Sequence, residues 1–326
     1  MQRLPNSRLS PQLLLAFSII TICLGLGIFE AFLRWVDIGD PPVFVGHPEI
    51  GYLLKPSQDA STRGHRFHIN QFGLRGADFA MPKPANVYRI VFVGDSVTYG
   101  GGAIPDEELF SNRTPAFFKT VSGRPVEGIN LSLPGWGIQN MAAYIGTRGC
   151  LDADLVVWTV PWADVYRPKT SLEVYAYPVE KPLTRIGYLF TRLYLLSTDL
   201  MRRLSSAKEW RLSSDRTRQS AAKILDHNVN SLRTALGSCL AQGAQAIVAV
   251  VPSYDEGSAD AEGVTEIQRV TNEMSVPFLD LNPVFRHQAR ESLFLDGAHL
   301  SAAGHRVVAE ELVRAIKTQS HLEVRT

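Results

Sequence analysis

The 326-residue chain has few cysteines and almost no net charge, and both shortages exclude classes of protein. Three cysteines are too few for the disulfide framework of a small secreted domain. With 33 Lys and Arg against 32 Asp and Glu, the chain lacks the basic excess of nucleic-acid-binding proteins, so no nucleic-acid partner is expected. Hydrophobic residues make up 45%, too many for a disordered chain. The composition predicts one large globular domain or two small ones.

Charge is missing altogether from residues 9 to 29. The apolar run that continues to residue 33 is long enough to cross a membrane as a helix. Arg3 and Arg8 precede it, so the positive-inside rule predicts a cytoplasmic segment 1–12 and a transmembrane signal-anchor over 13–33. The remainder would then lie in the periplasm or outside the cell. A cleaved signal peptide is the alternative, but no convincing small-x-small cleavage site follows the run.

The cysteines leave one alternative open. Cys23 falls within the apolar run, whereas Cys150 and Cys239 lie far beyond it. These two could form a disulfide in an oxidising compartment. Two buried free thiols fit the sequence equally well.

The chain after the apolar run divides at about residue 88. Residues 34–87 contain short apolar stretches broken by Gly, Pro and Asn, which predicts a membrane-proximal lead-in of loops and short strands. Beyond it, near-continuous apolar strands alternate with helical patterns. The strands are expected at 88–93, 126–131, 155–160, 246–251 and 276–280. The helices are expected at 109–121, 138–149, 218–242, 265–274 and 301–318. This pattern predicts a doubly wound α/β domain with a parallel sheet over 88–326.

Residues 166–217 connect the third and fourth predicted strands, and this segment is too long for an ordinary connection. Within it, residues 183–204 are apolar and aromatic with Arg at intervals, which predicts a helix. Packing in the core is the favoured interpretation of this helix. Packing on the active site or contact with the membrane surface is the alternative.

A serine and a histidine with a nearby aspartate stand where an open α/β sheet places its ligands, beyond the carboxyl ends of strands. Gly94-Asp95-Ser96 ends the first strand and begins a helix, which exposes the hydroxyl of Ser96 and leaves its N–H available. Asp296 precedes His299 by three residues on a turn, so its carboxylate can reach Nδ1–H and leave Nε2 for Ser96. We predict Ser96 as nucleophile, His299 as base and Asp296 as its orienting group. No cofactor is expected, and no His/Cys cluster has metal-ligand spacing.

These two motifs, in this order, resemble the SGNH/GDSL hydrolase family from about Tyr88 to the end of the chain. The lead-in segments 51–53 and 69–76 resemble membrane-anchored bacterial members. The resemblance implies a flavodoxin-like three-layer α/β/α fold, with a central parallel sheet of about five strands. It also implies ester hydrolysis by a serine in a shallow site. The Gly-x-Ser-x-Gly elbow of α/β-hydrolases is absent, since Thr98 stands where its second Gly would be.

The resemblance also identifies the groups expected to stabilise an oxyanion. Gly135, after the second strand, matches a family glycine whose N–H donates together with that of Ser96. After the third strand the family usually has Gly-x-Asn-Asp, in which the Asn side chain is a further donor. Here the run is Pro161-Trp162-Ala163-Asp164, so Ala163 occupies the Asn position. Loss of one oxyanion donor typically costs about 10²–10³ in rate.

Three interpretations of Ala163 remain open. Asn140, or a group from the insertion, could replace the missing donor. The enzyme could be slower or have a remodelled oxyanion hole, as in an acyltransferase. The site could also be degenerate and only bind. The intact Ser96, Asp296 and His299 favour a working catalyst, with Asp95 and Asp164 in supporting positions.

The resulting hypothesis is a membrane-anchored serine esterase. Family analogy suggests O-acetyl groups on cell-surface or exported polysaccharide as its substrate. Trp136 and Trp162 lie beside the motifs, where each could stack on a sugar or pack at the sheet edge. The alternatives are an acyltransferase that O-acetylates an exported glycan and a non-enzymatic carbohydrate-binding or assembly protein. The sequence does not indicate an oligomeric state.

Overall fold

A parallel sheet lies at the centre of the protein. The computed structural model describes residues 10–62, 64–174, 177–206, 214–254, 261–319 and 324–325. Its sheet has the strand order β10-β9-β8-β5-β7, and all neighbouring pairs are parallel. The strands are β5 (Tyr88–Gly94), β7 (Val126–Ser132), β8 (Leu155–Pro161), β9 (Gln245–Val251) and β10 (Phe278–Asp280). Every residue of β5 and β8 is buried, as their apolar sequences predict, and the five predicted strands are confirmed.

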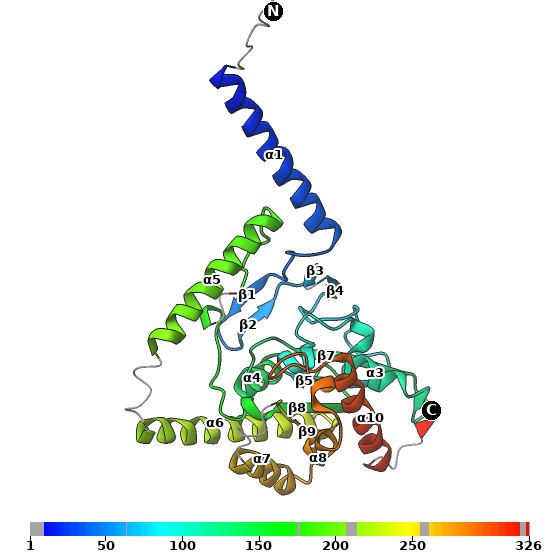
Figure 1. The fold of residues 1–326 in the computed structure, drawn as a ribbon. Helices are drawn as coiled ribbons and strands as arrows, with labels where there is room; N and C mark the ends of the chain where they lie inside the picture. The colour runs from blue at the N-terminus through cyan, green and yellow to red at the C-terminus, as the bar shows by residue number, and fades with distance from the viewer. Residues whose placement is uncertain are drawn as a thin grey trace, which may run out of the picture.

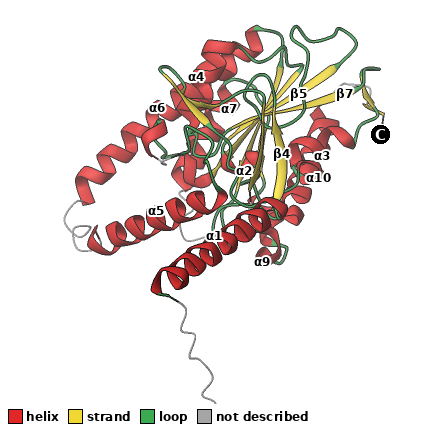
Figure 2. Ribbon diagram, turned by 90° about the horizontal axis from the view of Figure 1, so that it is seen from above, coloured by secondary structure: helices red, strands yellow, loops and turns green. Residues whose placement is uncertain are grey.

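Helices cover both faces of this sheet, which confirms the three-layer α/β/α architecture (Figures 1 and 2). One face carries α4 (Ile138–Arg148), α6 (Ser214–Ala241) and α7 (Ala261–Glu273). The other carries α3 (Phe110–Ala116), α8 (Asn282–Arg286), α9 (Arg290–Leu293) and α10 (Ala302–Gln319). Alternate residues of each strand point into the two apolar layers. In β5, for example, Val91 and Val93 pack towards α4, while Ile90 and Phe92 pack towards α10.

The helix predicted at residues 109–121 is shorter in the structure, where it is α3. The helix there ends at Ala116, because Pro115 cannot continue the intrahelical hydrogen bonds. Residues 120 and 121 instead form β6 (Thr120–Val121), paired with β11 (Val324–Arg325). The helices α6 and α7 begin four residues earlier than their apolar periodicity predicts, at Ser214 and Ala261.

The lead-in consists of two antiparallel hairpins. They are β1 (Phe44–His47) with β2 (Gly51–Leu54), and β3 (Gln58–Thr62) with β4 (His65–Ile69). The short strands match the prediction. Ile50, Tyr52, Leu54 and Ile69 are fully buried and belong to the same apolar cluster as α4. The lead-in is therefore part of the core of the domain.

The N-terminal helix α1 (Pro11–Trp35) projects away from this body (Figure 1). Leu33 is its one buried residue. By length and composition the helix is apolar and long enough to cross a membrane. Residues 36–43 connect its carboxyl end to β1.

The predicted helix in the long insertion is present as α5 (Arg185–Ser206). The expectation that it packs in the core is wrong. Phe190 and Tyr194 are each 68% exposed, and Leu193 is 61% exposed. An amphipathic pattern predicts that one face of the helix is covered, but it does not identify whether the protein core or another partner covers that face.

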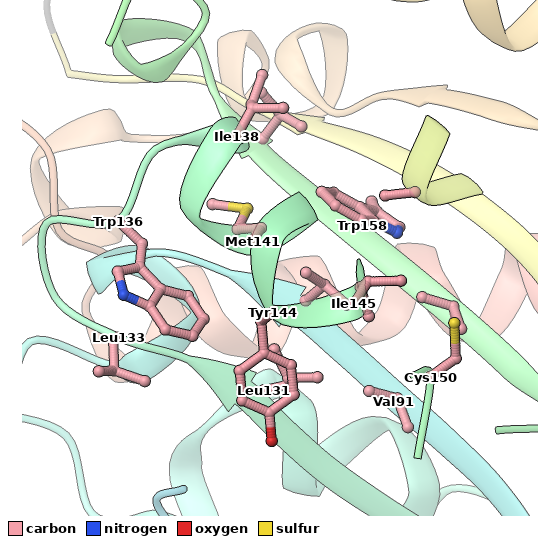
Figure 3. Close-up of a cluster of buried hydrophobic side chains, with 14 of the residues drawn as sticks. Val91, Leu131, Leu133, Trp136, Ile138, Met141, Tyr144, Ile145, Cys150 and Trp158 are labelled. Carbon is pink, nitrogen blue, oxygen red and sulfur yellow. The ribbon is translucent and has the colours of Figure 1, made fainter. Parts of the chain in front are cut away.

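A disulfide joins Cys150 and Cys239, with their Cα atoms 5.7 Å apart. It connects the turn after α4 to α6 on one face of the sheet. Figure 3 shows Cys150 in the apolar cluster beside Ile145 and Trp158. Of the two alternatives for these cysteines, the structure has the disulfide.

Candidate active site

Ser96 is the first residue of the short helix α2 (Ser96–Tyr99), directly after the end of β5. Asp95 caps this helix, since its Oδ1 accepts a hydrogen bond from the N–H of Val97 at 2.9 Å. Only glycine fits at position 94, because a Cβ there would lie 1.9 Å from Oγ1 of Thr98. The turn therefore brings the hydroxyl of Ser96 to the carboxyl end of the sheet, where the sequence predicts it.

The structure brings the three predicted residues together. Nε2 of His299 lies 3.1 Å from Oγ of Ser96, and Nδ1 lies 2.9 Å from Oδ2 of Asp296. The turn before α10 supports this arrangement, because Oδ1 of Asp296 accepts the N–H groups of Ala298 and His299 at 2.9 and 2.8 Å. The carboxylate is thus fixed at the distance that orients the imidazole.

The charge of Asp296 is secured by the same contacts. Partial burial acts to raise the pKa of Asp296. The hydrogen bonds from His299 N–H, Ala298 N–H and the His299 ring outweigh it and lower the pKa to about 2. The carboxylate is therefore ionised at neutral pH and stabilises positive charge on His299.

Gly135 lies in the turn between β7 and α4, with φ of 79°. Residues from distant segments hold this turn. The carbonyl of Pro134 accepts hydrogen bonds from the hydroxyls of Tyr52 at 2.6 Å and Tyr177 at 2.8 Å. The carbonyl of Gly135 accepts one from Oγ1 of Thr170 at 2.8 Å. Both carbonyls are thereby fixed by hydrogen bonds from other segments.

Sequence reasoning missed these three supporting residues. Tyr52 stands in the lead-in segment 51–53, whose sequence indicates only a resemblance to membrane-anchored family members. Thr170 and Tyr177 belong to the insertion, and no local pattern marks them, since their role depends on contacts between segments far apart in the chain.

Asn140 braces the same region and does not serve as an oxyanion donor. Its Nδ2 donates to the carbonyls of Ile50 at 2.7 Å and Thr170 at 2.8 Å. Its Oδ1 accepts the N–H groups of Gly137 and Thr170. Both amide hydrogens are already engaged, so the hypothesis that Asn140 replaces the missing Asn side chain is wrong for this arrangement.

Trp136 packs in the core, and Trp162 packs against it while partly buried. Trp136 is completely buried beside Leu133 and Tyr144 (Figure 3), and its Nε1 donates to the carbonyl of Tyr52 at 3.2 Å. Trp162 is partly buried against the same apolar cluster. The hypothesis that Trp136 stacks on a sugar is therefore wrong, and the packing alternative holds for Trp136.

Two buried carboxyl groups lie beneath Ser96. Asp164 ends the 3₁₀ helix η2 (Trp162–Asp164), where Ala163 replaces the family Asn, and its side chain is fully buried. Burial, and next the charge of Asp95, raise the pKa of Asp164 well above its usual value, although Arg167 binds its Oδ1. Asp95 also lies 3.3 Å from Oγ of Ser96 through its Oδ2. A proton on Asp164 avoids two like charges in a buried place.

A cavity of about 730 Å³ opens over Ser96 and His299. Asp95, Gly135 and Asp164 line it near the serine. A second part of its lining, mostly apolar, comes from the chain after α1 and the first turns of α5. These residues include Ile38, Pro41, Pro42, Tyr188, Leu189 and Arg192.

Residues 92–307 match the model of the GDSL-like lipase/acylhydrolase family. The chain belongs to this family. The match spans both Ser96 and His299 and makes this GDSL-like protein a serine ester hydrolase. No curated protein sequence matches the chain.

Solved structures of other hydrolases are similar to this GDSL-like protein at low identity. A catalytic mutant of the acetylxylan esterase Axe2 from Geobacillus stearothermophilus is 14% identical with a TM-score of 0.46, covering 70% of this chain and 94% of that one. A lipase/acylhydrolase from Enterococcus faecalis is 17% identical with a TM-score of 0.44, covering 73% and 99%. The lipase Lip_vut3 from a goat rumen metagenome is 16% identical with a TM-score of 0.48, covering 70% and 96%. At these values the similarities identify no substrate for this chain.

Proposed function

We propose that this GDSL-like hydrolase cleaves O-acetyl esters with Ser96 as its nucleophile. The observation that supports this most strongly is the continuous chain of contacts from Ser96 through His299 to Asp296. A serine hydroxyl is a weak nucleophile until a base removes its proton, and Nε2 of His299 lies where it can do so.

The reaction follows from these positions. Oγ of Ser96 attacks the ester carbonyl carbon as His299 takes the hydroxyl proton. The negatively charged oxygen of the tetrahedral intermediate receives hydrogen bonds from the N–H groups of Ser96 and Gly135. His299 then gives its proton to the departing alcohol, which leaves an acetyl group on Ser96. A water molecule, deprotonated by His299, releases acetate and restores the serine.

The missing Asn donor makes the two backbone N–H groups more important. Ser96 begins α2, so its N–H has no partner within the helix. Gly135 has a positive φ, and three hydrogen bonds hold its turn. Both favour a fixed orientation of the peptide group between Pro134 and Gly135, and therefore of the Gly135 N–H. A rigid pair of donors stabilises the oxyanion without a reorganisation cost.

We further propose that α1 anchors the enzyme, with the hydrolase domain outside the cytoplasm. Its 25 residues span about 37 Å at 1.5 Å per residue, enough for a hydrocarbon core of about 30 Å. Arg3 and Arg8 on its amino-terminal side favour a cytoplasmic N-terminus. The Cys150–Cys239 disulfide also favours an oxidising compartment. In that location, acetylated surface or exported polysaccharides are among the esters within reach of the enzyme.

The test is acetate release by the full chain from an O-acetylated polysaccharide. We expect release that Ser96→Ala abolishes and that Ser220→Ala leaves unchanged, because Ser220 is an exposed serine on α6. Transfer of labelled acetyl groups to a glycan, without release of acetate, would identify an acyltransferase instead. Equal release by the wild type and Ser96→Ala would refute the proposed nucleophile.

A further inference from the structure

Helix α5 exposes an apolar face that nothing in the described part of the chain covers. Phe190, Leu193, Tyr194 and Leu196 are each at least 60% exposed. The first three stand at positions i, i+3 and i+4, so they share one side of the helix. Leu183, just before the helix, is 95% exposed. A contiguous apolar patch of this kind on a helix marks a surface that contacts a membrane or another molecule.

The charges of α5 are mostly positive. The helix contains four arginines and one aspartate, at positions 185, 192, 202, 203 and 199. Aromatic and leucine residues combined with arginines are typical of helices that lie in the headgroup region of a bilayer. Arg185 is ion-paired with Asp40 at 3.1 Å, so the positive charge that phosphates and anionic lipids would attract is that of the other three arginines.

The position of α5 is tied to α1. Glu30, near the end of α1, accepts hydrogen bonds from the N–H groups of Arg185 at 3.0 Å and Ile186 at 3.1 Å, so it satisfies the free donors at the start of α5. Arg34 holds the same carboxylate at 2.8 Å. Figure 1 shows α5 starting beside the carboxyl-terminal part of α1 and extending away from α1 towards α6. The start of α5 is therefore held where a membrane-spanning α1 would leave the bilayer.

We infer that α5 lies on the lipid bilayer, with Phe190, Leu193 and Tyr194 in its headgroup and upper acyl region. This inference rests on the proposed anchoring by α1. A bilayer around α1 would reach the exposed face of α5 without any additional partner, and it supplies both an apolar layer and anionic groups for the arginines.

The same helix forms part of the active-site cavity. Tyr188, Leu189 and Arg192 line the cavity that holds Ser96 and His299. Contact of α5 with lipid therefore places one wall of the cavity against the membrane surface. Ester groups then reach Ser96 from the interfacial zone, as on glycan chains that are close to the membrane.

The test uses the full chain in liposomes of phosphatidylcholine and phosphatidylglycerol, in a Cys23→Ser background. Nitroxides are attached to Phe190→Cys and Tyr194→Cys. Leu24→Cys, on exposed α1, reports whether the anchor is in lipid, and Glu310→Cys, exposed on α10, is the aqueous reference. Collision of each label with oxygen, which concentrates in lipid, is compared with collision with a water-soluble nickel chelate.

We expect the labels at 190 and 194 to lose access to the nickel chelate and to gain access to oxygen, as at 24 and in contrast to 310. Labels at 190 and 194 that are as accessible to the chelate as 310, with 24 in lipid, overturn the inference while the anchor stands. Labels shielded from both reagents mean that another protein surface or a second copy covers α5, which also overturns it. An aqueous label at 24 refutes the anchor and this inference together.

Discussion

The disulfide between Cys150 and Cys239 is expected to contribute strongly to stability, because it links residues 89 positions apart. A cross-link removes conformations from the unfolded chain, and the loss grows with the logarithm of the loop length. For 89 residues the loop-entropy relation gives about 4.6 kcal/mol at 25 °C. We therefore predict that Cys150→Ser combined with Cys239→Ser lowers the free energy of unfolding by about this amount.

The assay is unfolding of the full chain in detergent micelles by guanidinium chloride, followed by tryptophan fluorescence, because Trp136 and Trp158 lie in the affected core. Cys23→Ser is the matched control, since Cys23 is an exposed residue of α1 that forms no disulfide. In thermal unfolding, the double variant should lose on the order of 10 °C. A loss below about 2 kcal/mol, the lower end for native disulfides, would contradict the loop-entropy reasoning.

Three further predictions concern buried or charged groups around the site. Arg75→Met should cost roughly 3 kcal/mol in chemical unfolding, because the buried guanidinium binds Asp106 and two backbone carbonyls, whereas the exposed Arg306→Met should change stability by less than about 0.5 kcal/mol. Asp296→Asn should lower kcat for an acetyl ester by about 10⁴-fold, since it removes the group that orients His299. The contribution of the Asp296 charge to stability is present above its unfolded pKa of 3.8 and is lost as pH falls through about 2, so unfolding profiles of wild type and variant should converge over that window. Asp164→Asn should flatten the pH dependence of the free energy of unfolding above pH 3.8. The raised pKa makes folded Asp164 hold a proton that the unfolded chain releases, so the stability of the wild type falls as pH rises. An unchanged slope in Asp164→Asn would show that Asp164 is ionised when folded.

The elements of the central sheet could be predicted from the sequence because their signals are local. Runs such as residues 90–93 are apolar throughout, which is what burial on both faces requires. The contact of Asp296 with His299 was predictable for the same reason, since a three-residue turn determines it. The position of Ser96 follows from the end of one strand and the start of one helix.

Features that depend on contacts between distant segments could not be predicted. The turn of Gly135 is held by Tyr52 from the lead-in and by Thr170 and Tyr177 from the insertion, and none of these shows its partner in its neighbouring sequence. Asn140 lies close to Gly135 in the sequence, which suggests that it could be an oxyanion donor. Its amide is instead used by the backbone of residues 50 and 170.

The exposure of α5 was mispredicted for a different reason. Hydrophobic periodicity shows that Phe190, Leu193 and Tyr194 share a face, but protein core and lipid surface require the same pattern. The exposure of these side chains excludes the core, and the position of the helix depends on the contact of Glu30 with its start, which joins residues more than 150 positions apart.

The most direct test of the account is covalent labelling of the intact enzyme with a fluorophosphonate, followed by mass spectrometry of its peptides. An activated serine displaces fluoride and keeps the phosphonate. We predict a single adduct, on Ser96, that forms at a much lower rate in His299→Ala and is absent from Ser96→Ala. Absence of an adduct from the wild type, or an adduct that persists in Ser96→Ala, would contradict the assignment of Ser96 as the nucleophile.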